Sequence, residues 1–240
     1  MELILPAPKK WTQLFGILLL LVFLFSLTIF AGNALLSFYK VKELNATVFF
    51  SSRILFWLPL LFIFIYARKA EGQKLLIWEE KKLLFWEYLV SAIAIFFALF
   101  IGLLIIIAVL LQFGLERESS KFLKMLVIFR ENPLLIFLTA ATAGIVEELT
   151  FRGYMLPRMV NLFKSPALGI IFSSLLFGLL HFSYGTVIQV VGPFFIGFIF
   201  ALYYYKFRNI KILIICHFLW DVMAIYLQLL AQDIKTLEKL

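Results

Sequence analysis

Long apolar stretches alternate with short polar segments along most of the 240-residue chain. A helix needs about 20 apolar residues to cross the hydrocarbon core of a bilayer. The pattern therefore predicts an all-α, polytopic membrane helical bundle with about seven to eight transmembrane helices. The seven clearest spans are residues 14–36, 48–67, 89–113, a fourth that begins at 133 and whose exit is marked by Pro157, Arg158 and Lys164, and then 166–185, 187–205 and 212–230.

Two segments between these spans mix charged and apolar residues. In residues 73–88, leucines and tryptophans are interspersed with glutamates and lysines, which predicts an interfacial helix or the start of the third span. Residues 122–130 predict a second membrane-surface segment, and either segment would supply an eighth span if it crossed the bilayer. Arg53, near the start of the second span, is expected to extend toward the lipid headgroups.

The composition supports a single integral membrane domain over residues 1–240. Hydrophobic residues make up 64% of the chain and charged residues 15%, far from the values of soluble domains. We expect a multi-pass protein of the cell membrane whose first helix is not cleaved as a signal peptide. The net charge of +8 indicates basic loops at anionic lipid rather than nucleic-acid binding. Cys216 is the only cysteine, so an internal disulfide is excluded.

Three ionisable residues interrupt the fourth apolar span. An ionised side chain at the bilayer centre costs about 2.5–3.5 kcal/mol, so Glu147, Glu148 and Arg152 indicate a functional site. On a helix, Glu148 and Arg152 share one face and are expected to form a structural ion pair. Glu147 points about 100° away and is left as the candidate general base.

The chain contains two histidines, and each is predicted within a hydrophobic helix. His181 lies four residues after Phe177, and His217 lies four residues before Asp221. The small residues Gly169, Ser173, Ser174 and Gly178 would allow close helix packing near His181. Isolated polar groups in hydrocarbon are costly, so we expect Glu147, His181, His217 and Asp221 to meet in one polar cavity.

These motifs resemble those of a known family. The CAAX-protease and bacteriocin-processing (CPBP, or abortive-infection) family of intramembrane endopeptidases has similar motifs in the same order on successive hydrophobic helices. The resemblance covers residues 133–230, the expected catalytic core, and implies a glutamate-dependent hydrolase acting on a membrane-associated or prenylated peptide or protein. The motifs are Glu147-Glu148-x-x-x-Arg152, Phe177-x-x-x-His181 and His217-x-x-x-Asp221.

The motifs of other intramembrane proteases are missing from the sequence. There is no His-Glu-x-x-His pattern of a zinc protease and no Gly-x-Ser-x-Gly element of a serine hydrolase. The only aspartates are Asp221 and Asp233, which do not form the paired motifs of an aspartyl protease. The glutamate-dependent class remains.

The resemblance implies a role for each residue of the site. Glu147 and His181 would activate a water molecule, and His217 and Asp221 would stabilise the oxyanion. CAAX proteases of this family commonly carry Asn at the position of Asp221. Either Asp221 is protonated and donates a hydrogen bond, or it orients His217 and holds its charged form.

The resemblance points to no required cofactor, but a divalent metal such as zinc stays open. If a metal is present, its ligands would be Glu147, His181, His217 and Asp221, a plausible set of nitrogen and oxygen donors. The expected partners are a peptide or lipidated protein substrate and the lipid bilayer, with no nucleic acid.

Two non-enzymatic alternatives also stay open. The same buried Glu and His groups would suit an ion- or proton-coupled transporter, although no internal repeat supports it. A membrane immunity protein that keeps the motifs but acts by binding is the second alternative. CAAX processing, bacteriocin maturation and immunity are not distinguished by the sequence.

Overall fold

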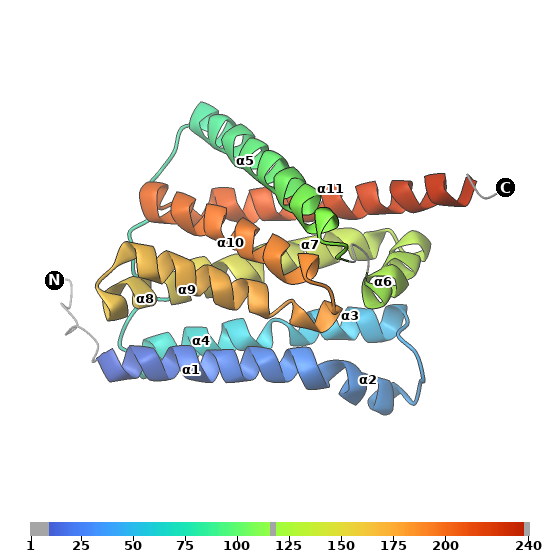
Figure 1. Ribbon diagram of the computed structural model, residues 1–240. Helices are drawn as coiled ribbons and strands as arrows, with labels where there is room; N and C mark the ends of the chain where they lie inside the picture. Colours follow the sequence, from blue (N-terminus) through green and yellow to red (C-terminus); the bar gives the residue numbers. More distant parts are fainter. Residues whose placement is uncertain (1–9, 116–118, 238–240) are drawn as a thin grey trace.

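The computed structural model describes residues 10–115 and 119–237, and every regular element in these ranges is a helix (Figure 1). The all-α prediction is confirmed. The α-helices are α1 (Lys10–Ser26), α2 (Gly32–Tyr39), α3 (Ala46–Leu55), α4 (Leu58–Lys69), α5 (Phe85–Gln112), α6 (Ser120–Glu131), α7 (Leu134–Glu147), α8 (Leu156–Phe163), α9 (Pro166–Leu179), α10 (Ile188–Phe207) and α11 (Ile210–Leu237). The other elements are the π-helices η1 (Leu27–Ala31) and η2 (Glu148–Met155) and the 3₁₀ turn η3 (Phe182–Tyr184).

Within the described ranges, seven helical segments are long and apolar enough to cross a membrane. Several join consecutive elements, so that α7, η2 and α8 form one segment. The polytopic architecture is confirmed with seven spans, and neither of the mixed segments adds an eighth. The spans are Lys10–Tyr39, Ala46–Lys69, Phe85–Gln112, Leu134–Phe163, Pro166–Tyr184, Ile188–Phe207 and Ile210–Ile234.

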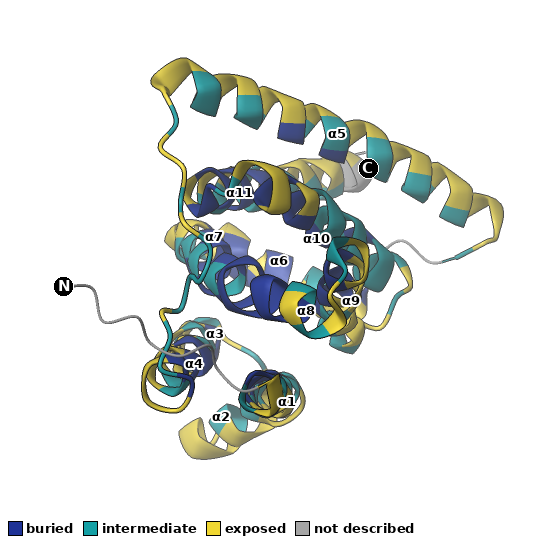
Figure 2. Ribbon diagram, turned by 90° about the vertical axis from the view of Figure 1, so that its left-hand side faces the viewer, coloured by how far each residue is buried: buried dark blue, intermediate teal, exposed yellow. Residues whose placement is uncertain are grey.

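The spans form a central group with a layer on each side (Figures 1 and 2). The segment from α7 to α8 packs with α9, α10 and α11 in the centre. Helices α1 and α4 cover one side of it through a shared apolar core. Helix α5 crosses the opposite side, where Ile95 and Leu99 are buried and most other residues of the helix are exposed or partly exposed (Figure 2).

Small residues bring the central helices close together. A Cβ atom at Gly178 of α9 would lie 2.7 Å from the carbonyl oxygen of Val190 on α10. A Cβ at Gly169 would lie 2.9 Å from the backbone nitrogen of Val160 on α8. These contacts hold α9 tightly between its neighbours and fix where its C-terminal end lies.

The prediction of a helix over residues 73–88 is wrong for most of its length, because α5 begins only at Phe85. The preceding residues take an irregular path along the ends of the spans, and tertiary hydrogen bonds replace helical ones. The backbone nitrogen of Lys81 donates to the carbonyl of Arg208 at 2.8 Å. Glu80 accepts from the Tyr204 hydroxyl at 2.6 Å and from the backbone nitrogen of Ile210, the first residue of α11, at 2.7 Å.

The other mixed segment is helical as predicted. Ser119 caps α6 by accepting a hydrogen bond from the backbone nitrogen of Phe122 at 3.3 Å. The apolar face of α6 is buried through Leu126 and Phe129, among others. Helix α6 thereby closes one end of the bundle beside α3 and η3.

Candidate active site

The two adjacent glutamates mark the junction between α7 and the π-helix η2. A π-helical turn is rare and often occurs at functional sites, because it changes the direction of the side chains that follow. Gly144, one turn before the junction, lets α11 approach, since a Cβ there would lie 3.0 Å from the carbonyl oxygen of Ile214. The close approach of these backbones places both glutamates beside His217.

Glu148 is fully buried, and one of its carboxylate oxygens accepts two hydrogen bonds. Its Oε1 accepts a hydrogen bond from Nη1 of Arg152 at 2.9 Å and from Nδ1 of His217 at 2.7 Å. The expected pairing of Glu148 with Arg152 is present. The contact with His217 was not expected, and it means that Glu148 also fixes the orientation of a histidine on another span.

Arg152 is packed between aromatic rings as well as paired. Its guanidinium carbon lies 4.3 Å from the ring centre of Phe177 and 5.5 Å from that of Phe200. The side chain is 1% exposed. Gly197 leaves room for it, because a Cβ there would lie 3.2 Å from Nη2 of Arg152.

The second nitrogen of His217 faces two carboxylates. Its Nε2 lies 3.8 Å from Glu147 and 3.6 Å from Asp221. Both distances exceed the range of a hydrogen bond, so Glu148 is the carboxylate that orients the ring and Asp221 is a neighbour of its free edge. Glu147, His217 and Asp221 therefore lie together, although they come from different parts of the chain.

The sequence predicted that His181 lies within a helix, and this is wrong. His181 lies in the turn between α9 and η3. Its backbone nitrogen bonds to the carbonyl of Gly178, so the preceding carbonyl, that of Phe177, is free to take another partner. The imidazole Nδ1 lies 2.9 Å from that oxygen. A carbonyl only accepts, so Nδ1 carries the proton, and Nε2 of the neutral ring keeps a free lone pair.

Both histidines contact the same aromatic ring. The ring of Phe177 lies 5.2 Å from that of His181 and 6.3 Å from that of His217, measured between centres. Phe177 therefore joins the segment bearing His181 to the cluster formed by Glu148, Arg152 and His217.

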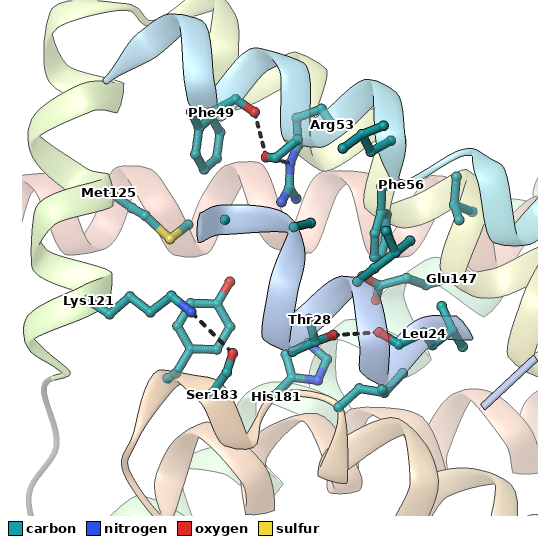
Figure 3. A pocket seen from close by; sticks show the side chains of 18 of the residues that line it. Leu24, Thr28, Phe49, Arg53, Phe56, Lys121, Met125, Glu147, His181 and Ser183 are labelled. Carbon is teal, nitrogen blue, oxygen red and sulfur yellow. Dashed lines mark hydrogen bonds between the residues drawn. The ribbon is translucent and has the colours of Figure 1, made fainter. Parts of the chain in front are cut away.

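A cavity of about 210 Å³ opens beside this cluster (Figure 3). Glu147 and His181 both line it, and the Glu147 carboxylate is 14% exposed. Its wall also includes apolar residues of α1, α3 and α9, such as Leu24, Phe49 and Phe177. His217 and Asp221 reach the site through their proximity to Glu147 and are not part of the cavity wall. The arrangement offers a carboxylate and an imidazole to a molecule held in an apolar pocket.

Sequence reasoning did not assign three other residues to this cavity. Arg53 was expected among the headgroups, but its side chain points into the cavity from α3 (Figure 3). Lys121 reaches the cavity from α6. The ring of Tyr184 stacks on His181 with a centre distance of 6.2 Å. The only signal in the sequence was that Arg53, a basic residue, lies within an apolar span, and this fitted a headgroup position equally well.

A metal site is not supported by these positions. Among the residues described, no group of three or more His, Cys, Asp and Glu side chains is arranged to hold a metal ion. The metalloprotease-like interpretation is therefore not supported. The possible ligand set Glu147, His181, His217 and Asp221 stays a prediction, since Nδ1 of each histidine is hydrogen-bonded but Nε2 is not.

Comparison with known proteins gives one family match, over part of the chain. Residues 129–223 match the model of the family described as type II CAAX prenyl endopeptidase Rce1-like. The matched segment begins in α6 and includes every residue of the Glu148 cluster, together with Glu147, His181 and Asp221. No curated protein and no solved structure matched the chain.

Proposed function

Since residues 129–223 match the model of the type II CAAX prenyl endopeptidase Rce1-like family, we propose that this multi-pass membrane protein is a glutamate-dependent intramembrane endopeptidase. Its substrate would be a membrane-associated or prenylated peptide or protein that reaches the active site within the bilayer. The observation that carries the proposal is that Glu147 and His181 both lie in the wall of one cavity. The family match does not favour the transporter or the immunity protein.

Glu147 and His181 activate the attacking water in this proposal. The Glu147 carboxylate takes a proton from a water molecule in the cavity, and Nε2 of His181 accepts the second hydrogen bond of that water. The resulting hydroxide adds to the carbonyl carbon of the scissile peptide bond. When the bond breaks, the proton held by Glu147 passes to the leaving amine, which balances the hydrolysis.

Stabilisation of the oxygen that becomes negative is assigned to His217, whose Nε2 lies 3.8 Å from the cavity-lining Glu147. With Nδ1 donating to Glu148, a proton on Nε2 makes the ring a donor toward the oxyanion, and Asp221 lies beside the same edge. Glu148 and Arg152 act as positioning residues, because they hold His217 and do not line the cavity. This division gives the two adjacent glutamates different roles: one faces the cavity and the other is buried.

The test is hydrolysis of a defined peptide by purified protein in nanodiscs. The probe is an S-farnesylated peptide with a CAAX-type C-terminus, and the products are identified by mass spectrometry. The wild type should release the C-terminal fragment. Replacing the base should lower the rate by about 10²- to 10⁴-fold in Glu147→Gln, and a similar loss is expected in His181→Ala.

Glu131→Gln is the matched control, because Glu131 is an exposed glutamate at the end of α6, outside the cavity. It should hydrolyse the peptide at the wild-type rate. Wild-type activity in Glu147→Gln would contradict the proposed role of Glu147. If Glu147→Gln is inactive as expected, comparison of membrane peptides from cells with wild-type and Glu147→Gln protein would identify natural substrates.

A further inference from the structure

The cavity that contains Glu147 and His181 also contains two basic side chains, Arg53 from α3 and Lys121 from α6 (Figure 3). Both precede residue 129, so they lie outside the segment that matches the family model. The cavity is therefore formed by the matched segment on one side and by the first half of the chain on the other. The role of these two cations is not explained by the chemistry proposed above.

Arg53 is held in place without a described acidic partner. Its Nε donates to the hydroxyl of Ser52 at 3.3 Å, and that hydroxyl donates to the carbonyl of Phe49 at 2.6 Å. The guanidinium carbon lies 5.0 Å from the ring centre of Phe49 and 5.5 Å from that of Phe56. The hydrogen bond from Nε and the contacts with the two phenylalanine rings hold the side chain in place. Both Nη groups are left to bind another molecule.

Two other arginines in the bundle form ion pairs with buried glutamates, and Arg53 does not. Arg152 is paired with Glu148, and Arg158 is paired with Glu71, with all four side chains at most 1% exposed. For Arg53, no carboxylate of the described residues lies within the 4 Å limit of an ion pair. Glu147 shares the cavity with Arg53 but forms no ion pair with it, so the guanidinium is available to an anionic ligand.

Lys121 lines the cavity from α6. Its Nζ donates to the hydroxyl of Ser183 at 3.3 Å and lies 5.6 Å from the ring centre of Tyr184. These contacts direct the ammonium group toward the turn that carries His181. The lysine therefore adds a second positive charge to the cavity lining.

We propose that Arg53, assisted by Lys121, binds the C-terminal carboxylate of the peptide whose scissile bond lies at Glu147 and His181. This proposal rests on the proposed protease function. A guanidinium with two free Nη groups matches the two oxygens of a carboxylate. The Glu147 carboxylate already places one negative charge in the cavity. The positive charges of Arg53 and Lys121 compensate for the second negative charge, that of the peptide carboxylate.

The cavity limits the length of the released fragment, because Arg53 and Glu147 line the same pocket of about 210 Å³. The residues between a C-terminal carboxylate at Arg53 and a scissile bond at Glu147 must fit within it. The enzyme would then select substrates by a free C-terminus and cleave close to it.

Binding is measured separately from hydrolysis. Full-length Glu147→Gln protein in phosphatidylcholine nanodiscs is titrated with a fluorescent S-farnesylated CAAX-type peptide, made either as the free acid or as the C-terminal amide. The acid should bind more tightly. Adding Arg53→Gln should weaken acid binding by about 10- to 100-fold, leave amide binding unchanged, and so remove the preference. Arg53→Lys should restore part of it.

Arg68→Gln is the matched control, because Arg68 also contacts a phenylalanine of its own span but is exposed outside the cavity. It should keep the full preference for the acid. Equal binding of acid and amide, or equal weakening of both by Arg53→Gln, would overturn the proposal. A lipid phosphate is the other source of an anion, and competition by phosphatidylglycerol that Arg53→Gln abolishes would assign the site to lipid instead.

The two proposals fail in different ways. A wild type that hydrolyses no peptide, while the acid preference still depends on Arg53, would refute the protease and leave the carboxylate site standing. Hydrolysis of acid and amide at equal rates, unaffected by Arg53→Gln, would leave the protease standing and refute the carboxylate site.

Discussion

Replacing Arg152 tests how the buried cluster holds the site together. Arg152→Ala removes the 2.9 Å hydrogen bond to Glu148 and the contacts with the rings of Phe177 and Phe200. Breaking one partner of a buried ion pair costs about 3–5 kcal/mol. The lost cation–π contacts add up to about 2 kcal/mol, and the remaining hydrogen bond from His217 to Glu148 offsets part of the total. We expect a net destabilisation of about 3–5 kcal/mol.

Cys216 provides the assay, because it is the only cysteine of the chain and is fully buried. A thiol-reactive fluorogenic dye therefore reports unfolding of the purified protein in detergent. A loss of about 3–5 kcal/mol in a chain of this size lowers the midpoint of thermal unfolding by roughly 6–20 °C. Arg130→Ala is the control, since it breaks an exposed arginine–carboxylate pair, which is worth about 0–1 kcal/mol.

A midpoint for Arg152→Ala within about 2 °C of the wild type would refute the reasoning. If that stable protein were also inactive, Arg152 would belong to the chemistry rather than to the support of His217. Arg152→Lys separates charge from shape, because it keeps the positive charge but loses the planar contact with the two rings. Its midpoint should lie between those of the wild type and Arg152→Ala.

Three further predictions concern other parts of the site and the fold. Asp221→Asn should retain activity within about 10-fold, because Asp221 is too far from the histidine ring to orient it; a loss of about 1000-fold would contradict this. Gly178→Ala should destabilise the protein by about 1–3 kcal/mol in the dye assay, because its Cβ would meet a carbonyl of α10, whereas Gly32→Ala, with nothing within 4 Å, should not. Partial burial lowers the pKa of Lys121, so free-acid peptide binding to Glu147→Gln protein should weaken as the pH rises through that pKa; Lys121→Arg should move this loss to higher pH, and an unchanged pH profile would contradict the assignment.

Local spacing explains why much of the fold and part of the cluster could be predicted. Spans follow from the length of apolar stretches, because a bilayer imposes both the length and the helical conformation. The pair formed by Glu148 and Arg152 follows from a separation of four residues. Both features depend on residues that are near one another in the chain.

The remaining features depend on how distant segments meet. The contact between Glu148 and His217 joins residues 69 positions apart and depends on how α7 and α11 are aligned. Residues 73–84 have a helix-like composition, but bonds such as that from Asn209 to the carbonyl of Lys81 favour another backbone path. The direction of Arg53 likewise depends on the cavity between α1, α3 and α9, which no single segment contains.

The central claim is that Glu147 activates a water molecule that attacks the peptide bond directly. A single turnover in H₂¹⁸O, with protein in excess over the S-farnesylated peptide, tests it. The account predicts one ¹⁸O atom in the new carboxyl group of the first product molecules and none in Glu147. Unlabelled first product, with ¹⁸O found in the Glu147 carboxyl group, would show instead that the glutamate itself attacks and would contradict the account.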